Sequence, residues 1–146
     1  MKLILVRHGE SARNRGYQVA DADNNLTAEG VRQAIRLAEE LSGTKIDAIY
    51  CSSSARCRQT LDEILRLRDD LMPIHISKLV GPKLKKEGFE QLQRRIEIFV
   101  DDLKYEHTTE ETILIISHQM PLRMMVYMTQ KKDKRFENAE LFQIIL

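Results

Sequence analysis

The chain has 146 residues, a length typical of one domain, and a domain of this size buries about 68–70% of the surface of its unfolded chain. Apolar residues make up 42% and charged residues 31%, which excludes the collagenous, low-complexity and disordered classes. Lys plus Arg (23) balances Asp plus Glu (22) and Trp is absent, so nothing in the composition favours nucleic-acid binding. We expect a single globular domain over residues 1–146.

The cysteines and the N-terminal residues suggest where the protein works. Cys51 and Cys57 form no CxxC motif, so we expect neither a zinc site nor a disulfide framework. The apolar run over 3–6 ends at Arg7 and is too short for a signal-peptide core or a bilayer span. These features favour the reducing cytoplasm and no association with a membrane.

The first half of the chain alternates apolar runs and polar turns. The elements expected in chain order are a strand over 3–6, a polar loop over 8–25, a helix from its N-cap Thr27 to a stop at Gly43, a strand over 46–51, a helix capped by the hydroxyls of Ser52-Ser53-Ser54, and a short strand over 74–76. The run Leu-Ile-Leu-Val over 3–6 has no polar face. It therefore predicts a strand that is buried on both sides, as in a sheet covered by helices.

The second half continues this alternation. The clearest helix places apolar residues at helical spacing over four turns, at Phe89, Leu92, Ile96, Phe99, Val100 and Leu103. A strand over 112–116, a helix over 121–128 and a strand over 141–146 follow. The pattern predicts an α/β fold, a three-layer sandwich with a mostly parallel central sheet flanked by helices.

Reactive side chains follow the expected strands. In open α/β sheets ligands bind beyond the carboxyl ends of the strands, and these ends here carry Arg7 and His8, Arg56, and His118. Two guanidinium groups and two imidazoles in one crevice suit a dianionic phosphoryl group, because guanidinium matches phosphate oxygens and imidazole can attack phosphorus. His75 and His107 have no partner motif, and we expect them to be structural or solvated.

Four segments resemble a known family. Arg7-His8-Gly9-Glu10-Ser11 with Asn14 resembles the R-H-G-E-[TS]-x-x-N signature of the histidine phosphatase superfamily. Three more segments match that family in order: residues 26–34 with Leu26-Thr27, Gly30 and Gln33-Ala34, residues 52–60 with Ser52, Arg56, Gln59 and Thr60, and Ile115-Ile116-Ser117-His118. A single Arg-His-Gly tripeptide is weak evidence, but four segments in family order make coincidence implausible.

The resemblance implies a covalent mechanism in which His8 attacks phosphorus and becomes a phosphohistidine. The phosphate pocket that it implies consists of Arg7, Arg56, His118, Ser11, Asn14 and, where the family usually has glycine, Gln119. In the attack, protonated His118 and the two arginines are expected to balance the charge of the transferring group. No carboxylate cluster has the spacing of Mg²⁺ ligands, so we expect no metal and no cofactor.

The general acid is the main departure from the family. Many relatives carry it as a glutamate in a segment like L-x-E-x-x-x-G-x-x-E-G, whereas Leu79-Val80-Gly81 is followed by no carboxylate before Glu87. Glu10 and Glu87 are the candidates for this role. A missing acid favours substrates with a good leaving group, since protonation is worth about 10²–10⁴-fold in rate. Short family members that act on protein phosphohistidine also lack the insertion that carries the acid.

The expected function is therefore a metal-independent phosphatase that works through phosphohistidine on His8. Its expected partner is a phosphorylated protein, through phosphohistidine, or another substrate with a good leaving group. The alternatives are a phosphomonoesterase acting on a small phosphorylated metabolite, such as a sugar phosphate or a nucleotide, and a non-catalytic phosphate-binding adaptor. A metal-dependent hydrolase with His8 and His118 as ligands is a weaker alternative.

Overall fold

The computed structural model describes residues 1–146 and contains one five-stranded sheet. Its strands are β1 (Lys2–Arg7), β2 (Ala48–Cys51), β3 (Ile74–Ile76), β4 (Thr112–Ser117) and β5 (Leu141–Ile145). They lie in the order β3-β2-β4-β1-β5, and only β5 is antiparallel to its neighbour. The expected α/β fold with a mostly parallel sheet is confirmed, although β2 is two residues shorter than expected at its start.

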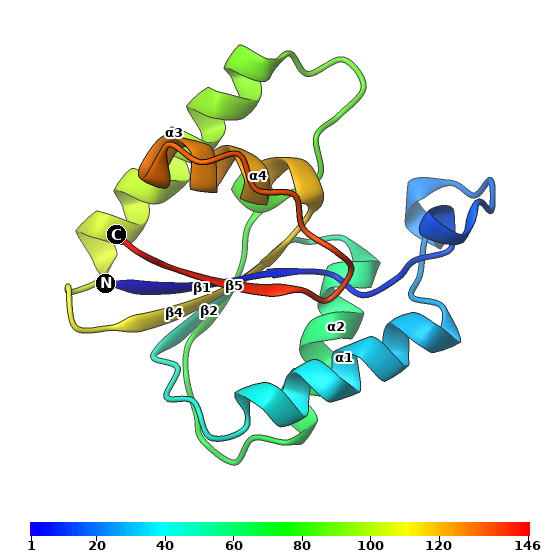
Figure 1. Cartoon of the computed structure of the whole chain (residues 1–146), viewed down its shortest axis with the longest axis horizontal. Helices are drawn as coiled ribbons and strands as arrows, with labels where there is room; N and C mark the ends of the chain where they lie inside the picture. The colour runs from blue at the N-terminus through cyan, green and yellow to red at the C-terminus, as the bar shows by residue number, and fades with distance from the viewer.

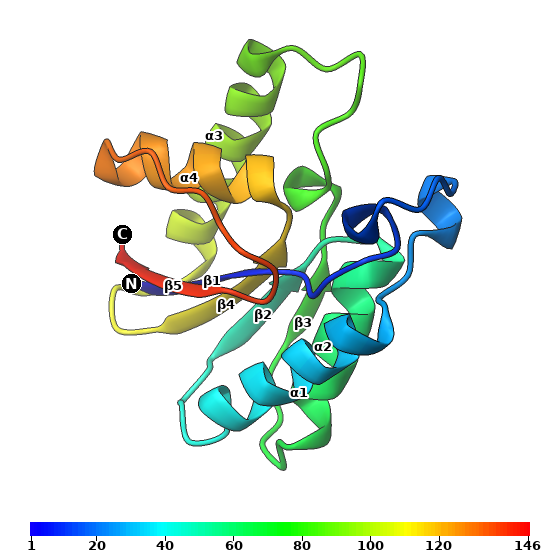
Figure 2. The ribbon, with the colours of Figure 1, turned by 45° about the vertical axis from the view of Figure 1, so that its right-hand side comes forward.

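Four helices cover the sheet. They are α1 (Ala28–Leu41), α2 (Ala55–Arg66), α3 (Phe89–Glu106) and α4 (Gln119–Gln130). Figure 1 shows α1 and α2 on one face of the sheet and α3 and α4 on the other, and the turned view in Figure 2 shows the same layers. No helix of the protein is both long enough and apolar enough to cross a bilayer.

The two faces of the sheet contribute to two separate cores. Leu3 and Leu5 of β1 pack with α3 and α4, whereas Ile4 and Val6 pack with α1 and α2. This division follows from the strand geometry, because successive side chains point to opposite faces. It explains the unbroken apolar run of β1, which a strand with one solvated face would not need.

The structure confirms one of the two expected helix N-caps. The Thr27 hydroxyl accepts a hydrogen bond from the Gly30 N–H, as expected of an N-cap. Ser54 precedes α2, but its hydroxyl makes no capping bond, so the expected serine cap is wrong. Phe89, expected in the core, is 62% exposed because it occupies the first residue of α3, beyond the covered part of the helix.

The register of the sheet decides where the reactive residues meet. Arg7 at the end of β1 pairs with Ser117 at the end of β4. The next residue on each strand is a histidine, so His8 and His118 leave the sheet at the same edge. In Figure 2 the loop over 8–25 lies at this edge, next to the start of α2. The central parallel strands thus bring distant segments of the chain to one site.

Candidate active site

The ring of His8 is held in one tautomer. Its Nδ1 lies 2.7 Å from the Gly9 carbonyl oxygen, which can only accept, so Nδ1 carries the proton and Nε2 keeps its lone pair. Burial and, to a smaller extent, the charges of Arg56 and Arg7 lower the pKa of His8 to about 3 against the opposing effect of the Gly9 bond. His8 is therefore a neutral imidazole at physiological pH. This is the form that can attack phosphorus.

His118 lies beside His8, with ring centroids 5.2 Å apart. Arg56 Nη2 donates to His118 Nδ1 at 3.2 Å, which leaves the ring proton on Nε2, where it faces the Ser52 hydroxyl at 2.8 Å. Burial, then the neighbouring His8 ring and Arg56, lower the pKa of His118 to about 2. His118 is therefore neutral in the ligand-free site, chiefly because it is buried. A protonated His118 during the attack, with the phosphoryl group in place, stays a prediction.

Arg7 and Arg56 line the same cavity as the two histidines, with a volume of about 480 Å³. Arg56 is buried, and its Nη1 binds the carboxylate of Asp21 at 3.1 Å. Arg7 Nη1 donates to the Phe136 carbonyl at 2.7 Å, but Arg7 Nε is the one buried side-chain nitrogen or oxygen of the protein without a hydrogen-bond partner. A buried donor without a partner costs about 1–3 kcal/mol, which a bound anion would offset.

Ser11, Asn14 and Gln119 also belong to this site, as expected from the sequence. Asn14 Oδ1 accepts three hydrogen bonds, from the backbone and hydroxyl of Ser11 and from the side chain of Asn138. Gln119 Oε1 accepts from the Phe136 N–H at 2.8 Å. Since both amide oxygens are occupied, both NH₂ groups remain as donors on residues that line the cavity.

The remaining motif residues hold the His8 loop in place. A Cβ on Gly9 would lie 2.6 Å from the Gly30 oxygen, and a Cβ on Gly30 would lie 2.0 Å from the Glu10 oxygen, so the loop packs backbone to backbone on α1. Gln33 accepts from the Glu10 N–H, and the Thr60 hydroxyl accepts from the Gly9 N–H. These residues support the site without lining it.

The two carboxylates proposed as acids are not brought into the catalytic cavity. Glu10 accepts a hydrogen bond from the Thr27 hydroxyl at 2.8 Å and lies 3.7 Å from Arg15. Glu87 accepts two hydrogen bonds from Arg95, which lower the pKa of its carboxyl and keep it ionised. It lines a neighbouring cavity of about 590 Å³ and not the one that contains His8.

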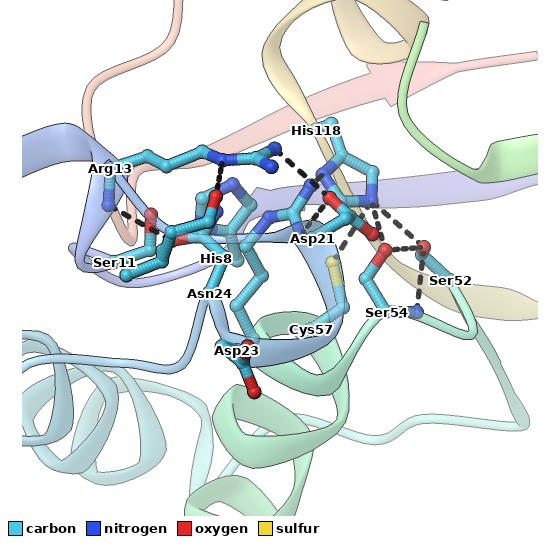
Figure 3. Close-up of polar contacts among 12 residues, drawn as sticks. His8, Ser11, Arg13, Asp21, Asp23, Asn24, Ser52, Ser54, Cys57 and His118 are labelled. Carbon is cyan, nitrogen blue, oxygen red and sulfur yellow. Dashed lines mark hydrogen bonds and ion pairs between the residues drawn. The ribbon is translucent and has the colours of Figure 1, made fainter. Parts of the chain in front are cut away.

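Sequence reasoning missed Asp21, Asn24 and Asn138. Asp21 and Asn24 line the cavity from the polar loop over 8–25, where no periodicity or motif marks them (Figure 3). Asn138 precedes β5 and donates to the His8 carbonyl at 3.3 Å as well as to Asn14. The only signal for Asn138 was an Asn-Ala pair between polar residues, which is too common to mark a site.

No three His, Cys, Asp or Glu side chains of the protein lie close enough together to act as metal ligands.

The chain resembles known proteins in both sequence and structure. A family model described as the histidine phosphatase superfamily (branch 1) matches residues 3–81 and 77–143. A probable phosphatase of Schizosaccharomyces pombe is 41% identical over 85 residues, which are 58% of this chain and 40% of that protein. This chain thus matches less than half the length of that relative.

Two solved structures share the fold. The alpha-ribazole phosphatase of Shigella flexneri superposes with a TM-score of 0.73 at 26% identity, over 88% of this chain and 79% of the other. The protein histidine phosphatase SixA superposes with a TM-score of 0.78 over 98% of this chain and 86% of the other, and its 19% identity supports the fold alone. With the site geometry and a family model over nearly the whole chain, we conclude that this protein belongs to branch 1 of the histidine phosphatase superfamily.

Proposed function

We propose that this protein is a metal-independent phosphatase that transfers a phosphoryl group to His8 and then to water. The observation that carries this proposal is the Nδ1 bond of His8 to the Gly9 carbonyl, which directs the lone pair of a neutral ring to Nε2. An imidazole that is both neutral and fixed in orientation needs no base to activate it.

The surrounding donors would stabilise the transferring group. Arg7, Arg56 and the NH₂ groups of Asn14 and Gln119 line one cavity with His8, and they are fixed there by the protein before substrate binds. Preorganised donors of this kind commonly supply the largest part of the rate enhancement in phosphoryl transfer. This argument favours a catalyst over an adaptor that only holds phosphate.

Of the candidate substrates, the cavities favour small phosphomonoesters. The catalytic cavity shares Asp21, Pro82 and Leu84 with the neighbouring cavity of about 590 Å³, so a leaving group of metabolite size has a place beside the phosphoryl group. The alpha-ribazole phosphatase of similar fold carries the name of such a substrate.

Protein phosphohistidine is the second candidate. Its support is the absence of the acid-bearing insertion from the sequence and the fold shared with SixA, which is named as a protein histidine phosphatase. The protein would meet such a substrate in the cytoplasm, the compartment in which its two free thiols, Cys51 and Cys57, stay reduced.

A substrate panel with chelator present tests both candidates. It contains a phosphohistidine-bearing protein, phosphoserine, a sugar phosphate, a nucleotide and 4-nitrophenyl phosphate. We expect phosphate release from at least one member and ³²P trapped on His8 after acid-free quenching. If the protein binds phosphate but neither releases it from any substrate nor becomes labelled, the protein is an adaptor and the proposal is wrong.

A further inference from the structure

Asp21 is the only acidic side chain among the residues that line the catalytic cavity. It also lines the neighbouring cavity, in which the leaving group of a small phosphomonoester would lie. Asp21 therefore stands at the boundary between the atoms that bind the phosphoryl group and the space for the leaving group. A proton donor for the bridging oxygen has to occupy this position.

The position of Asp21 is fixed by its loop. Asp21 begins the short 3-10 helix Asp21–Asp23, and the next residue, Asn24, is buried and accepts a hydrogen bond from the Arg13 N–H at 2.9 Å. Figure 3 shows the Asp21 side chain directed to Arg13 and the catalytic cluster, whereas Asp23 on the same turn points away. The backbone thus presents one of its two carboxylates to the site.

In the ligand-free protein the Asp21 carboxylate is bound by two arginines. Its Oδ1 lies 3.1 Å from Arg56 Nη1 and 3.2 Å from Arg13 Nη1. A phosphoryl group bound to Arg56 competes for the same N–H donor. Its arrival takes one of the two arginines from Asp21 and places the ester beside the carboxyl. The side chain is 56% exposed, so water can deliver a proton to the carboxyl.

We infer that Asp21 is the general acid of the reaction, released for this role when the substrate takes its place on Arg56. The inference rests on the proposed phosphatase function. In the first step His8 Nε2 forms a bond to phosphorus as the bond from phosphorus to the ester oxygen breaks. That oxygen keeps the electron pair of the broken bond and takes the proton of Asp21, so the leaving group departs as an alcohol.

The second step restores both residues. The Asp21 carboxylate takes a proton from the water that attacks the phosphohistidine, and the bond between phosphorus and Nε2 breaks with its electron pair returning to His8. Inorganic phosphate leaves, Asp21 returns its proton to the solvent, and the carboxylate binds Arg56 again. With Asp21 as acid the chain has a proton donor, so the missing insertion no longer favours substrates with a good leaving group.

The test compares Asp21→Asn with Asp23→Asn, which makes the same charge change on the same turn outside the cavity. The kcat/KM value is measured for phosphoserine, an alkyl ester, and for 4-nitrophenyl phosphate, whose leaving group needs no proton, because kcat/KM reports the first step. Inhibition by inorganic phosphate is measured for each variant.

We expect Asp21→Asn to lower kcat/KM for the alkyl ester by about 10²-fold or more and for the aryl ester by less than about 5-fold. Inorganic phosphate should inhibit Asp21→Asn several-fold more tightly, because a competing carboxylate is gone, and Asp23→Asn should match the parent in all three measurements. Equal losses on both esters, no loss on the alkyl ester, or weaker inhibition by phosphate would overturn the inference. A parent protein that hydrolyses neither ester and traps no label overturns the proposed function as well.

Discussion

The two ends of the central sheet both carry histidine, arginine and carboxylate side chains, but they use them differently. At the amino ends of the strands, Arg68 donates to the Leu41 and Thr44 carbonyls at 2.9 Å and to the Asp70 carboxylate. There His107 lies between the Tyr50 hydroxyl at 2.9 Å and Glu111. Each of these polar groups is occupied by another part of the same protein.

At the carboxyl ends the side chains are left incomplete. Arg7 Nε has no partner, the Nε2 lone pair of His8 is unused, and Arg56 is bound to an exposed carboxylate that a ligand can displace. The same residue types therefore stabilise the fold where their hydrogen bonds are satisfied within the chain. They form a binding site where the backbone holds them in place with donors and acceptors left free. The following predictions test this distinction.

The largest effect should come from replacing His8, with His107 at the opposite end of the sheet as the comparison. We expect His8→Ala to lower kcat by a factor on the order of 10⁴ or more, because both ring nitrogens of His118, the other imidazole of the cavity, are engaged in hydrogen bonds. Circular dichroism should show an intact fold. His107→Asn is the control, and it should leave kcat within twofold. Activity of His8→Ala within a few-fold of the parent would refute the nucleophile assignment.

Replacing Arg56 should mainly lower activity, whereas replacing Arg68 should mainly lower stability. Arg56→Ala is expected to lower kcat/KM by about 10²–10³-fold, the loss typical when one donor to a transition state is removed. Arg68→Ala should instead lower the free energy of unfolding by about 1–3 kcal/mol, since it leaves the Thr44 carbonyl without a donor and the Leu41 carbonyl with only the Thr44 N–H. Urea titration and steady-state kinetics on both variants measure this, and a large kinetic defect in Arg68→Ala would contradict it.

The pH dependence of stability should reveal the two buried histidines at the site. The pKa of His8 is lowered to about 3 and that of His118 to about 2, whereas an unfolded histidine titrates near 6.5. Below pH 6.5 the unfolded chain binds protons that the folded chain does not, so stability falls as pH falls. We expect a loss of about 1–2 kcal/mol for each histidine between pH 7 and pH 5.

Urea unfolding of the parent and of His8→Asn at both pH values checks this prediction. The variant should lose less stability on acidification than the parent, because one buried imidazole is gone. An identical pH dependence in the two proteins would show that the ring of His8 becomes protonated in the folded state as readily as in the unfolded state.

The smallest effect is expected from chelation. Since arginines and amides are proposed to neutralise the phosphoryl group, EDTA should leave kcat and KM unchanged within error, for the parent and for Asp23→Asn alike. The assay is initial-rate hydrolysis of 4-nitrophenyl phosphate after dialysis against chelator. Loss of activity that Zn²⁺ or Mg²⁺ restores would show that a metal takes part.

The sequence alone determined the sheet and the residues that leave its edge. Strands such as β1 and β4 could be read from apolar runs, because a strand buried on both faces tolerates no polar residue. Arg7, His8, Arg56 and His118 then followed, since parallel strands present their carboxyl ends to one side. The Gly9 and Gly30 positions were marked by motif, and the structure adds the physical reason, a backbone contact that no side chain would permit.

Only the tertiary structure decided the surroundings of these residues. The loop over 8–25 has no periodicity, and its shape is set by distant partners, such as Gln59, which donates to the Asn25 side-chain oxygen at 2.9 Å across 34 residues of chain. For this reason the sequence did not identify Asp21 and Asn138 as site residues. Glu10 was a candidate acid, but its carboxylate accepts a hydrogen bond from Thr27 and does not line the cavity. Hydrogen bonds between segments far apart in sequence leave no local pattern, and these bonds place the polar side chains around His8.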